Sequence, residues 1–144
     1  MATVNEVTRA DLTRPLILKV VEDIEYSVGS TMGPRGRNVV IEGAYGPPTI
    51  TRDGVSVLTA QKPEGARESM ITQLVAQAAK KTNDIAGDGT TTATVLVKAI
   101  FAEGLKALAS GCSEMDIKRG IEQATTAIVE ALQSNSESIS SQEK

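Results

Sequence analysis

Two long helical patterns meet at a short segment of glycine and threonine, and this junction constrains the fold most. The segment is Gly87-Asp88-Gly89-Thr90-Thr91-Thr92. Apolar residues recur at three- and four-residue steps over residues 66–85 before it, and a second, more apolar pattern runs over residues 90–109 after it. Two such patterns around a tight glycine turn predict a mainly helical chain.

The junction also has a chemistry of its own. Its two glycines allow the backbone to turn sharply and to approach a ligand closely. Its three threonines open a helix, where unpaired N–H groups and the helix dipole favour an anion. Asp88 can hold Mg²⁺ through a carboxylate oxygen. The same residue types are also ordinary helix caps, so phosphate binding and capping both stay open at this point.

Composition limits the classes of fold and partner. The 144 residues are the size of one domain, and the aromatic residues are Tyr26, Tyr45 and Phe101 alone. Any core is therefore aliphatic and rich in alanine, which suits close helix packing better than a β-sandwich. Stacking platforms for nucleic acid use aromatic side chains, and the net charge is −3, so we expect no nucleic-acid partner.

The single cysteine, Cys112, and the absence of histidine exclude several kinds of site. A disulfide framework within the chain, a Cys/His zinc site and a Ser–His–Asp triad cannot be built. The first eleven residues lack the apolar stretch of a signal peptide, and charged residues interrupt the apolar run over residues 93–108. We therefore expect no membrane partner and a cytoplasmic location.

The chain begins with a predicted helix over residues 12–27 and a small hairpin. The apolar face of the helix consists of Ile17, Val20, Val21 and Ile24. Pro15 is expected in its first turn, because proline suits that position and not a helix interior. Residues 38–42 and 49–51 are predicted to pair as a hairpin. Residues 54–65 form a short helical or irregular link.

Two loops in this half are candidate sites. The loop over residues 30–37, Ser30-Thr31-Met32-Gly33-Pro34-Arg35-Gly36-Arg37, is basic and glycine-rich, so its N–H groups could cradle an anion. Taken alone it favours a plain helix-to-strand connection. Asp53 precedes Gly54, which is a turn signal. The alternative for Asp53 is an acid that positions water or acts as a general base near a phosphate.

Three helices are predicted in the second half. Over residues 66–85 the apolar stripe is Met70, Ile71, Leu74, Val75, Ala78 and Ile85. The helix over residues 90–109 is apolar nearly all round, so we expect it to be central and buried. Ser113 and Asp116 resemble a capping box before a last helix that runs to about Gln133. Residues 134–144 form a polar, serine-rich tail.

Three long motifs resemble the group I chaperonins, the bacterial GroEL type. They are Thr31-Met32-Gly33-Pro34-Arg35-Gly36-Arg37-Asn38-Val39-Val40, Pro48-Thr49-Ile50-Thr51-Arg52-Asp53-Gly54-Val55-Ser56-Val57 and Asn83-Asp84-Ile85-Ala86-Gly87-Asp88-Gly89-Thr90-Thr91-Thr92-Ala93-Thr94-Val95-Leu96. Glu103-Gly104-Leu105-Lys106 and Met115-Asp116-Ile117-Lys118-Arg119-Gly120-Ile121 also match. The order and separations agree, and the resemblance covers roughly residues 16–132. It implies the first half of the equatorial domain, a helical bundle that binds ATP and forms ring contacts, over residues 1–133.

The resemblance implies roles for individual residues. Thr31, Met32, Gly33 and Pro34 match a nucleotide-contacting loop, and Gly89, Thr90, Thr91 and Thr92 match the phosphate-binding helix start. Asp88 matches the Mg²⁺ ligand, and Asp53 matches an acid near the γ-phosphate that acts in hydrolysis. Arg52 stands where the family usually has lysine, and its planar fork is not a point charge. ATP and Mg²⁺ are the implied cofactors, with K⁺ as a further candidate.

Length is the largest departure from the family pattern. Family members are several times longer, and their chain continues near residues 134–144 into the intermediate and apical domains. The implied partners are chaperonin subunits of a homo-oligomeric ring, while unfolded protein and co-chaperonin bind the apical domain, which is missing here. The second catalytic acid and half of the pocket are missing too. We therefore expect a truncated product or fragment with exposed apolar patches and at most partial ATP binding. The alternative is a non-catalytic module that joins or modulates a full-length ring.

Overall fold

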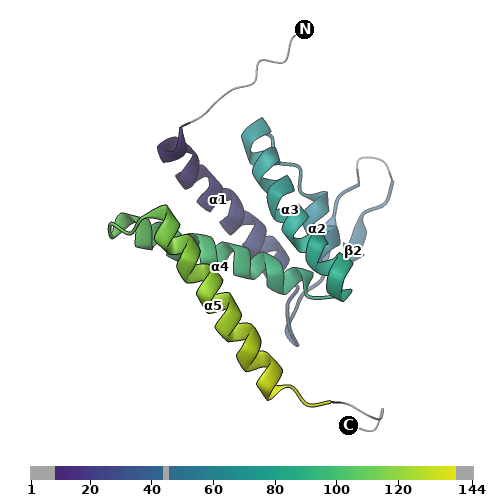
Figure 1. The fold of residues 1–144 in the computed structure, drawn as a ribbon. Helices are drawn as coiled ribbons and strands as arrows, with labels where there is room; N and C mark the ends of the chain where they lie inside the picture. The colour runs from purple at the N-terminus through teal and green to yellow at the C-terminus, as the bar shows by residue number, and fades with distance from the viewer. Residues whose placement is uncertain (1–8, 44–45, 139–144) are drawn as a thin grey trace. The chain divides into compact units, whose positions relative to one another are not determined.

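The computed structural model describes residues 9–43 and 46–138, and over these ranges the chain is mainly helical, as predicted (Figure 1). Its elements are α1 (Ala10–Gly29), β1 (Val39–Ile41), β2 (Thr49–Thr51), α2 (Gly54–Ala60), α3 (Ala66–Ala86), α4 (Thr90–Ala109) and α5 (Glu114–Asn135). The predicted hairpin, short link and long helices are therefore confirmed. The chain divides into two compact units, residues 1–103 and residues 104–144.

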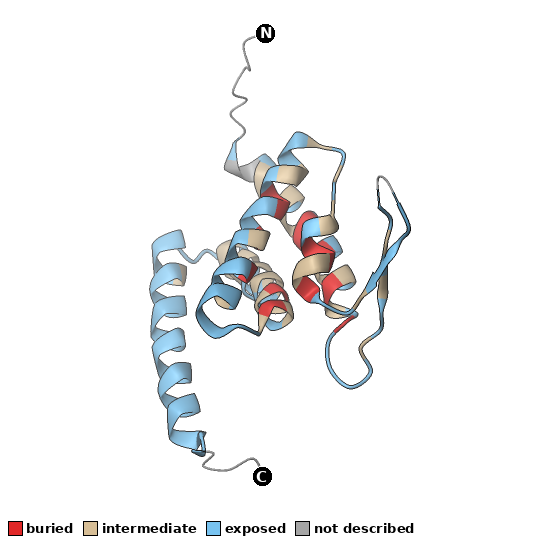
Figure 2. Cartoon of the chain, turned by 90° about the vertical axis from the view of Figure 1, so that its right-hand side faces the viewer, coloured by how far each residue is buried: buried red, intermediate tan, exposed pale blue. Residues whose placement is uncertain are grey.

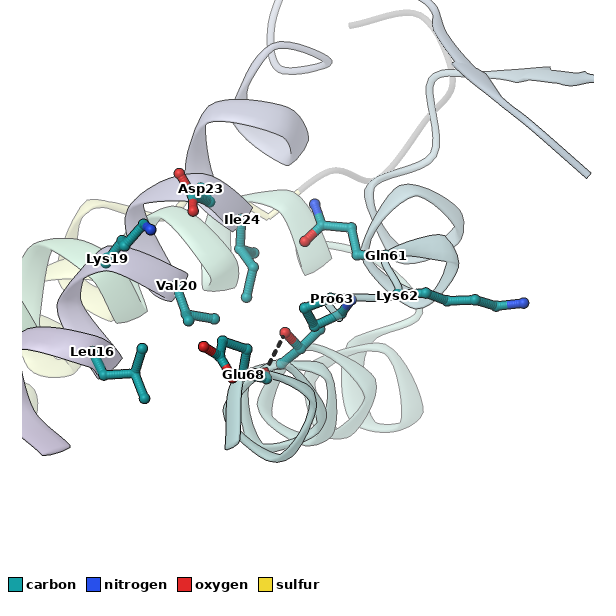
Figure 3. A pocket seen from close by; sticks show the side chains of 10 residues that line it. Leu16, Lys19, Val20, Asp23, Ile24, Gln61, Lys62, Pro63 and Glu68 are labelled. Carbon is teal, nitrogen blue, oxygen red and sulfur yellow. Dashed lines mark hydrogen bonds between the residues drawn. The ribbon is translucent and has the colours of Figure 1, made fainter. Parts of the chain in front are cut away.

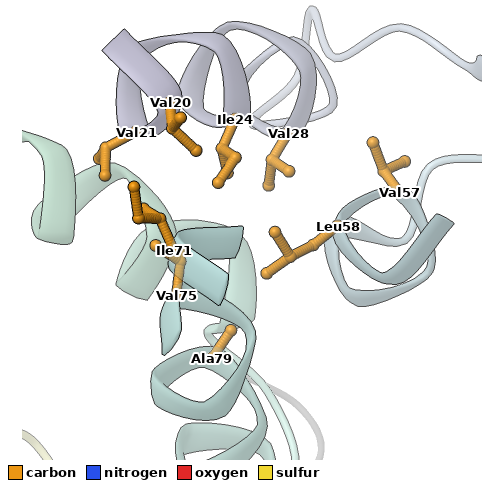
Figure 4. Close-up of a cluster of buried hydrophobic side chains, with 9 residues drawn as sticks. All are labelled: Val20, Val21, Ile24, Val28, Val57, Leu58, Ile71, Val75 and Ala79. Carbon is orange, nitrogen blue, oxygen red and sulfur yellow. The ribbon is translucent and has the colours of Figure 1, made fainter. Parts of the chain in front are cut away.

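The core of the first unit lies where α1, α2 and α3 pack together (Figure 4). It consists of Val20, Val21, Ile24 and Val28 from α1, Val57 and Leu58 from α2, and Ile71, Val75 and Ala79 from α3. The predicted apolar face of α1 is confirmed, because Ile17 packs against this cluster beside its buried members. Each buried Val, Ile or Leu side chain contributes roughly 1.5–3 kcal/mol to folding. The core therefore fixes α1 and α2 with respect to each other.

The hairpin is antiparallel, with Val40 opposite Ile50. Both of these side chains are exposed. Val39 and Ile41 point to the other face, where they are half-buried and pack against the core. One face of the hairpin thus packs against the core of the first unit. Arg52 and Asp53 follow directly after the end of β2.

The position of Pro15 was predicted wrongly. The helix begins at Ala10, so Pro15 is its sixth residue and lies inside the helix rather than in its first turn. Proline has no N–H to donate to the residue four positions earlier, and this lost bond destabilises a helix interior. Packing of the later apolar face of α1 against α2 and α3 offsets that loss.

The buried stripe of α3 differs in part from the predicted one. Ile71 and Val75 are buried as expected, but Leu74 is 60% exposed and Ile85 is 78% exposed. The buried positions are instead Ile71, Thr72, Val75 and Ala79. Periodicity alone could not place the stripe, because apolar residues occur on both sides of this helix.

The prediction that α4 is central and buried is also wrong. Only Thr90 and Thr94 are buried among its residues, and Leu96 and Ile100 are about half exposed. An all-round apolar helix needs neighbours on every side. The described residues do not supply them, so the predicted exposed apolar surface is found on this helix and on α3.

The second unit contains the end of α4 and the helix α5. Ser113 begins α5 as predicted: its Oγ accepts a hydrogen bond from the Asp116 N–H at 3.1 Å and donates to the Asp116 carboxylate at 2.6 Å. The helix continues to Asn135, two residues beyond the predicted end. None of its residues is buried (Figure 2), although Ile117 is half-buried. Among the described helices, none is long and apolar enough to cross a membrane.

Candidate functional site

The loop after α1 is closed by its own hydrogen bonds. The Thr31 N–H and hydroxyl both donate to the Val28 carbonyl, at 3.1 and 2.7 Å. The Arg37 N–H donates to the Ser30 carbonyl at 2.8 Å and so ties the two ends of the loop together. Thr31 is buried at the base of the loop. The loop is therefore a compact structure that continues α1, rather than an extended connection.

The outer part of this loop carries the other predicted residues. Met32, Gly33 and Pro34 are exposed. Gly33 has a φ of 75°, a conformation that glycine adopts without strain. The Gly36 N–H donates to the Gly33 carbonyl at 3.0 Å, which closes a tight turn over residues 33–36. This turn presents the exposed residues at the tip of the loop.

Arg52 reaches this turn from the end of β2. Its Nη2 donates to the Gly33 carbonyl at 3.3 Å. The same nitrogen lies so close to Gly36 that a Cβ placed on this glycine would stand 2.8 Å from it. The guanidinium of Arg52 therefore rests against the turn, and the structure brings Arg52 together with the predicted loop.

Asp53 follows Arg52 and caps α2. Its Oδ2 accepts hydrogen bonds from the Ser56 N–H at 2.9 Å and the Ser56 hydroxyl at 2.6 Å. Its Oδ1 accepts a longer bond from the Val55 N–H at 3.4 Å. The turn chemistry expected for Asp53 is therefore present, in the form of a helix N-cap.

These contacts determine the acidity of Asp53. Donation from the Ser56 hydroxyl, and next from the Ser56 N–H, lowers the pKa of the Asp53 carboxyl below its ordinary value of 3.8, and slight burial opposes this shift. A carboxylate with a lowered pKa is a weak proton acceptor near neutral pH. Asp53 therefore suits a role as a fixed negative charge, which orients water or a cation, better than a role as general base.

The junction between α3 and α4 is built from two glycines with positive φ. Gly87 ends α3 with a φ of 73°, and its N–H donates to the Asn83 carbonyl at 2.8 Å. Gly89 has a φ of 85°, and it accepts a bond from Ala93 at the start of α4. Between them Asp88 is exposed, with its Oδ1 accepting from the Gly89 N–H at 2.6 Å. The sharp turn thus presents the Asp88 carboxylate at the surface.

The threonines that follow differ in exposure. Thr90 is buried, Thr91 is half-buried and Thr92 is exposed. Thr94 is also buried, and its hydroxyl donates to the Thr90 carbonyl at 2.9 Å. Thr90 and Thr94 therefore anchor the first turn of α4 to the first unit, while Thr92 lies on its accessible side.

Close packing brings the start of α2 against the start of α4. Gly54 is buried, and a Cβ on it would collide with the Thr91 Oγ1 and stand 3.2 Å from the Thr91 Cβ. The end of α1 joins them, since a Cβ on Gly29 would stand 3.7 Å from the Val95 Cγ2. Three segments that are distant in sequence, residues 29–37, 52–54 and 87–95, therefore converge at one end of the first unit.

The contacts that join these segments involve residues that were not among the site residues predicted from the sequence. Gly36 and Gly54 carry the close approaches, and Ser56 controls the acidity of Asp53. A glycine after an acid is an ordinary turn signal, so only the three-dimensional packing shows why Gly54 has no side chain. The pattern Asp53–Ser56, with a hydroxyl three residues after the cap, was the one available signal for Ser56.

A separate hollow lies away from these segments. Figure 3 shows this hollow of about 300 Å³ among α1, the link after α2 and the start of α3. It is lined by Leu16, Lys19, Val20, Asp23, Ile24, Gln61, Lys62, Pro63, Glu68 and Thr72. Two lysines and two acids give it no net charge to attract an anion. None of the predicted site residues lines it.

The converging segments fit a metal-bound phosphate in their chemistry. Among the described residues, no three or more Cys, Asp or Glu side chains group together in a way that could hold a metal ion. Mg²⁺ does not need such a group, because it is usually held by one or two carboxylates together with phosphate oxygens and water. Asp88 supplies a carboxylate beside a helix N-terminus, and the half-buried and exposed threonines supply hydroxyls.

Comparison with curated proteins gives close relatives. Heat shock protein 60, mitochondrial, of Ajellomyces capsulatus is 47% identical over 131 residues, and heat shock protein 60 of Emericella nidulans is 48% identical over 131 residues. Each match covers 91% of this chain and 22% of the relative. The chain thus spans about a fifth of the length of these proteins.

Solved structures of similar fold agree. The chaperonin gp146 of the bacteriophage EL 2 (Pseudomonas aeruginosa), crystallised in the presence of ATP-BeFx, superposes with a TM-score of 0.73 at 26% identity, over 88% of this chain and 22% of that one. A group III chaperonin in the open state gives a TM-score of 0.76 at 24% identity, over 90% and 26%. The family match itself covers residues 24–144. The chain therefore belongs to the TCP-1/cpn60 chaperonin family.

Proposed function

We propose that this chain is an ATP- and Mg²⁺-binding part of a chaperonin subunit that assists the refolding of unfolded protein within a ring. The observation that carries the proposal is the contact between Gly54 and Thr91, because it joins an acidic helix start to a glycine–threonine helix start. Family membership supports the same function, as does the ATP analogue present with the phage chaperonin. The identity to heat shock protein 60 favours the group I type.

In this proposal, different residues of the chain bind different parts of the nucleotide and its metal ion. The start of α4, with Gly89, Thr90, Thr91 and Thr92, receives the phosphates on backbone N–H groups and hydroxyls. Thr31, Met32, Gly33 and Pro34 form the loop on the other side of the nucleotide. Asp88 holds Mg²⁺, which neutralises charge on the phosphates. Arg52 adds a positive charge beside the loop, and K⁺ is a further candidate ion here.

Asp53 has a charge role in this proposal rather than a proton-transfer role. Its carboxylate is held by Ser56 and Val55 in an ionised state. A fixed carboxylate can orient a water molecule toward the γ-phosphate without accepting its proton in the resting state. Asp53 is a weak proton acceptor and would act on the water alone, so we expect hydrolysis by this chain to be very slow or absent.

Calorimetric titration of the purified chain with ATP, with and without Mg²⁺, tests the proposal. Binding that requires Mg²⁺ and disappears in Asp88→Ala is the expected result. Asp84→Ala is the matched control, because Asp84 is an exposed acid one turn earlier on α3. Unchanged binding in Asp88→Ala contradicts the assignment of the metal ligand, and an absence of binding in every titration contradicts nucleotide binding by this chain.

A second substitution separates the two roles of Asp53. Asn is as good an N-cap as Asp, so Asp53→Asn should leave the stability of α2 nearly unchanged. The same substitution removes the negative charge. We expect any slow, Mg²⁺-dependent release of phosphate to disappear in Asp53→Asn while nucleotide binding persists. Equal hydrolysis by both proteins contradicts a role for Asp53 in hydrolysis.

The exposed apolar side chains favour a second candidate function. Met70, Leu74 and Ile85 on α3, and Leu96 and Ile100 on α4, are large and about half or more exposed. We propose as the alternative that the chain co-assembles with a full-length chaperonin ring and modulates it without catalysis. Co-elution of the purified chain with a purified full-length ring on a sizing column supports this alternative, and separate elution contradicts it.

Three further expectations stay predictions. Binding of unfolded protein and co-chaperonin through an apical domain concerns residues beyond those of this chain, and the assignment of residues 1–133 to part of an equatorial domain follows from the resemblance alone. A cytoplasmic location is likewise proposed from the sequence. Imaging of the tagged chain in cells tests the location directly.

A further inference from the structure

We propose that Arg52 is a positioning residue, which holds the 30–37 loop in its nucleotide-binding conformation through the Gly33 carbonyl. This inference rests on the proposed nucleotide site. In this inference Arg52 holds a loop of the protein in place and does not act on the phosphate alone. The residues concerned belong to segments nineteen positions apart, so the contact is a tertiary one.

The Gly33 carbonyl is the centre of the arrangement. It accepts one hydrogen bond from the Gly36 N–H at 3.0 Å and a second from the Arg52 Nη2 at 3.3 Å. A carbonyl oxygen has two lone pairs, so both bonds can exist together. The first bond closes the turn over residues 33–36, and the second attaches that turn to the end of β2. The attachment is charge-assisted and therefore stronger than a neutral bond of the same geometry.

Gly36 provides the independent second observation. A Cβ at this position would collide with the Thr31 carbonyl and stand 2.8 Å from the Arg52 Nη2. The loop therefore folds around a space that only glycine leaves open, and the guanidinium lies beside that space. Thr31 is buried at the base of the same loop. Arg52 therefore contacts the turn at Gly36, Gly36 contacts Thr31, and Thr31 is bonded to the end of α1.

The consequence concerns the exposed tip of the loop. Met32, Gly33 and Pro34 have few neighbours to fix them, because all three are exposed. Their conformation before nucleotide arrives depends on the turn behind them, and Arg52 restricts that turn. A loop that is ordered in advance loses less conformational freedom on binding, so it binds more tightly. Arginine, with a planar fork of donors, can hold the carbonyl with one nitrogen and keep other donors available.

The experiment compares variants of the full chain in two measurements. The first is amide hydrogen exchange of Gly36 and Arg37 without nucleotide, followed by NMR, because their N–H groups make the two bonds that close the loop. The second is ATP–Mg²⁺ affinity. Arg52→Met keeps most of the apolar stem and removes every donor. We expect roughly tenfold faster exchange at both amides and roughly tenfold weaker nucleotide binding.

Three further variants distinguish positioning from simple charge. Arg52→Lys keeps one donor for the Gly33 carbonyl and should restore part of both effects. Gly36→Ala keeps the Arg52 charge, but its methyl group would collide with the Thr31 carbonyl and press on the guanidinium, so this variant should reproduce both effects. The double variant Gly36→Ala/Arg52→Met should bind no more weakly than Gly36→Ala alone, since both changes disrupt one unit. Lys62→Gln removes one exposed positive charge from the hollow that lies away from these segments and should change neither measurement.

Several results overturn the inference. Unchanged exchange in Arg52→Met shows that Arg52 does not hold the loop. Faster exchange with unchanged affinity shows that the held conformation does not matter for nucleotide. Additive losses of affinity in the double variant show that Arg52 acts on the phosphate directly. If the wild-type chain binds no nucleotide, the proposed function itself is contradicted. That result is visible in the wild-type titration, before any variant is measured.

Discussion

Gly54 packs directly against the side chain of Thr91, at a distance that leaves no room for a Cβ. The first residue of α2 and the second residue of α4 are thus in contact, although 37 positions separate them in the sequence. Asp53 precedes the first of these residues, and the glycine turn with Asp88 precedes the second. This contact places both predicted acidic segments at the same end of the first unit.

The first prediction concerns this contact. Gly54→Ala should destabilise the chain by roughly 1–3 kcal/mol, because the new methyl group must displace Thr91 or Val28 in a packed region. Nucleotide affinity should fall together with stability, since the start of α4 moves. Urea unfolding followed by circular dichroism measures the first effect, and calorimetry measures the second.

Gly120→Ala is the matched control for that substitution. Gly120 is inside α5, and apart from its chain neighbours and the adjacent helix backbone no atom of the described residues lies within 4 Å of the position that its Cβ would take. Alanine is a better helix former than glycine by about 1 kcal/mol, so this variant should be slightly more stable. Equal stability changes in the two variants would contradict the packing account of Gly54.

The second prediction concerns pH. The folded pKa of Asp53 is lowered, so the stabilisation that it contributes is fully present above the unfolded value of 3.8 and is lost as pH falls through the lower folded value. Ser56→Ala removes the largest cause of the shift and should bring the pKa back toward 3.8. NMR titration of the Asp53 carboxyl carbon measures this. A titration curve unchanged by Ser56→Ala would show that the hydroxyl is not the cause.

The third prediction concerns the exposed apolar surface. Leu74 is 60% exposed and Ile85 is 78% exposed on α3. We expect the isolated chain to bind a hydrophobic dye and to associate in solution. The double variant Leu74→Gln/Ile85→Gln should bind less dye and sediment closer to the monomer mass. A sharp, cooperative monomer melt of the wild-type chain without dye binding would argue against this account.

The fourth prediction concerns α5, which has no buried residue to support it. Its stability therefore depends on local features such as the Ser113 cap. Ser113→Ala should weaken the first turn by about 1 kcal/mol, whereas Ser113→Asp should preserve it. Amide exchange near the start of α5 measures the effect. Exchange that is equally slow in Ser113→Ala would show that contacts elsewhere maintain the helix.

Local features of the fold were predictable from the sequence. The hairpin partners, the glycine end of α3 at Gly87 and the Ser113 cap all depend on neighbours close in the chain, so residue type and spacing predict them. The burial of Val20 and Ile24 followed from periodicity in the same way. The helical patterns predicted the mainly helical fold class, and the family resemblance, later confirmed, added the chaperonin family.

Tertiary features were not predictable in this way. The side of α3 that faces the core depends on where α1 and α2 lie, so Leu74 was placed on the wrong side. The burial of α4 depends on neighbours that the described residues do not provide. The Gly54–Thr91 contact and the hold of Arg52 on Gly33 each join distant positions, and spacing along the chain contains no information about either.

The most direct test of the central claim uses Mn²⁺ in place of Mg²⁺ with ATP. A single metal–nucleotide site at the converging segments predicts that paramagnetic broadening appears together at the amides of residues 31–34, 52–54 and 88–92, only when ATP is present. The amides at the far end of the same unit, at the start of α1, should be spared. Asp88→Ala should abolish the broadening at all three segments. Broadening that is independent of ATP, or confined to one segment, would contradict the claim that these segments form one site.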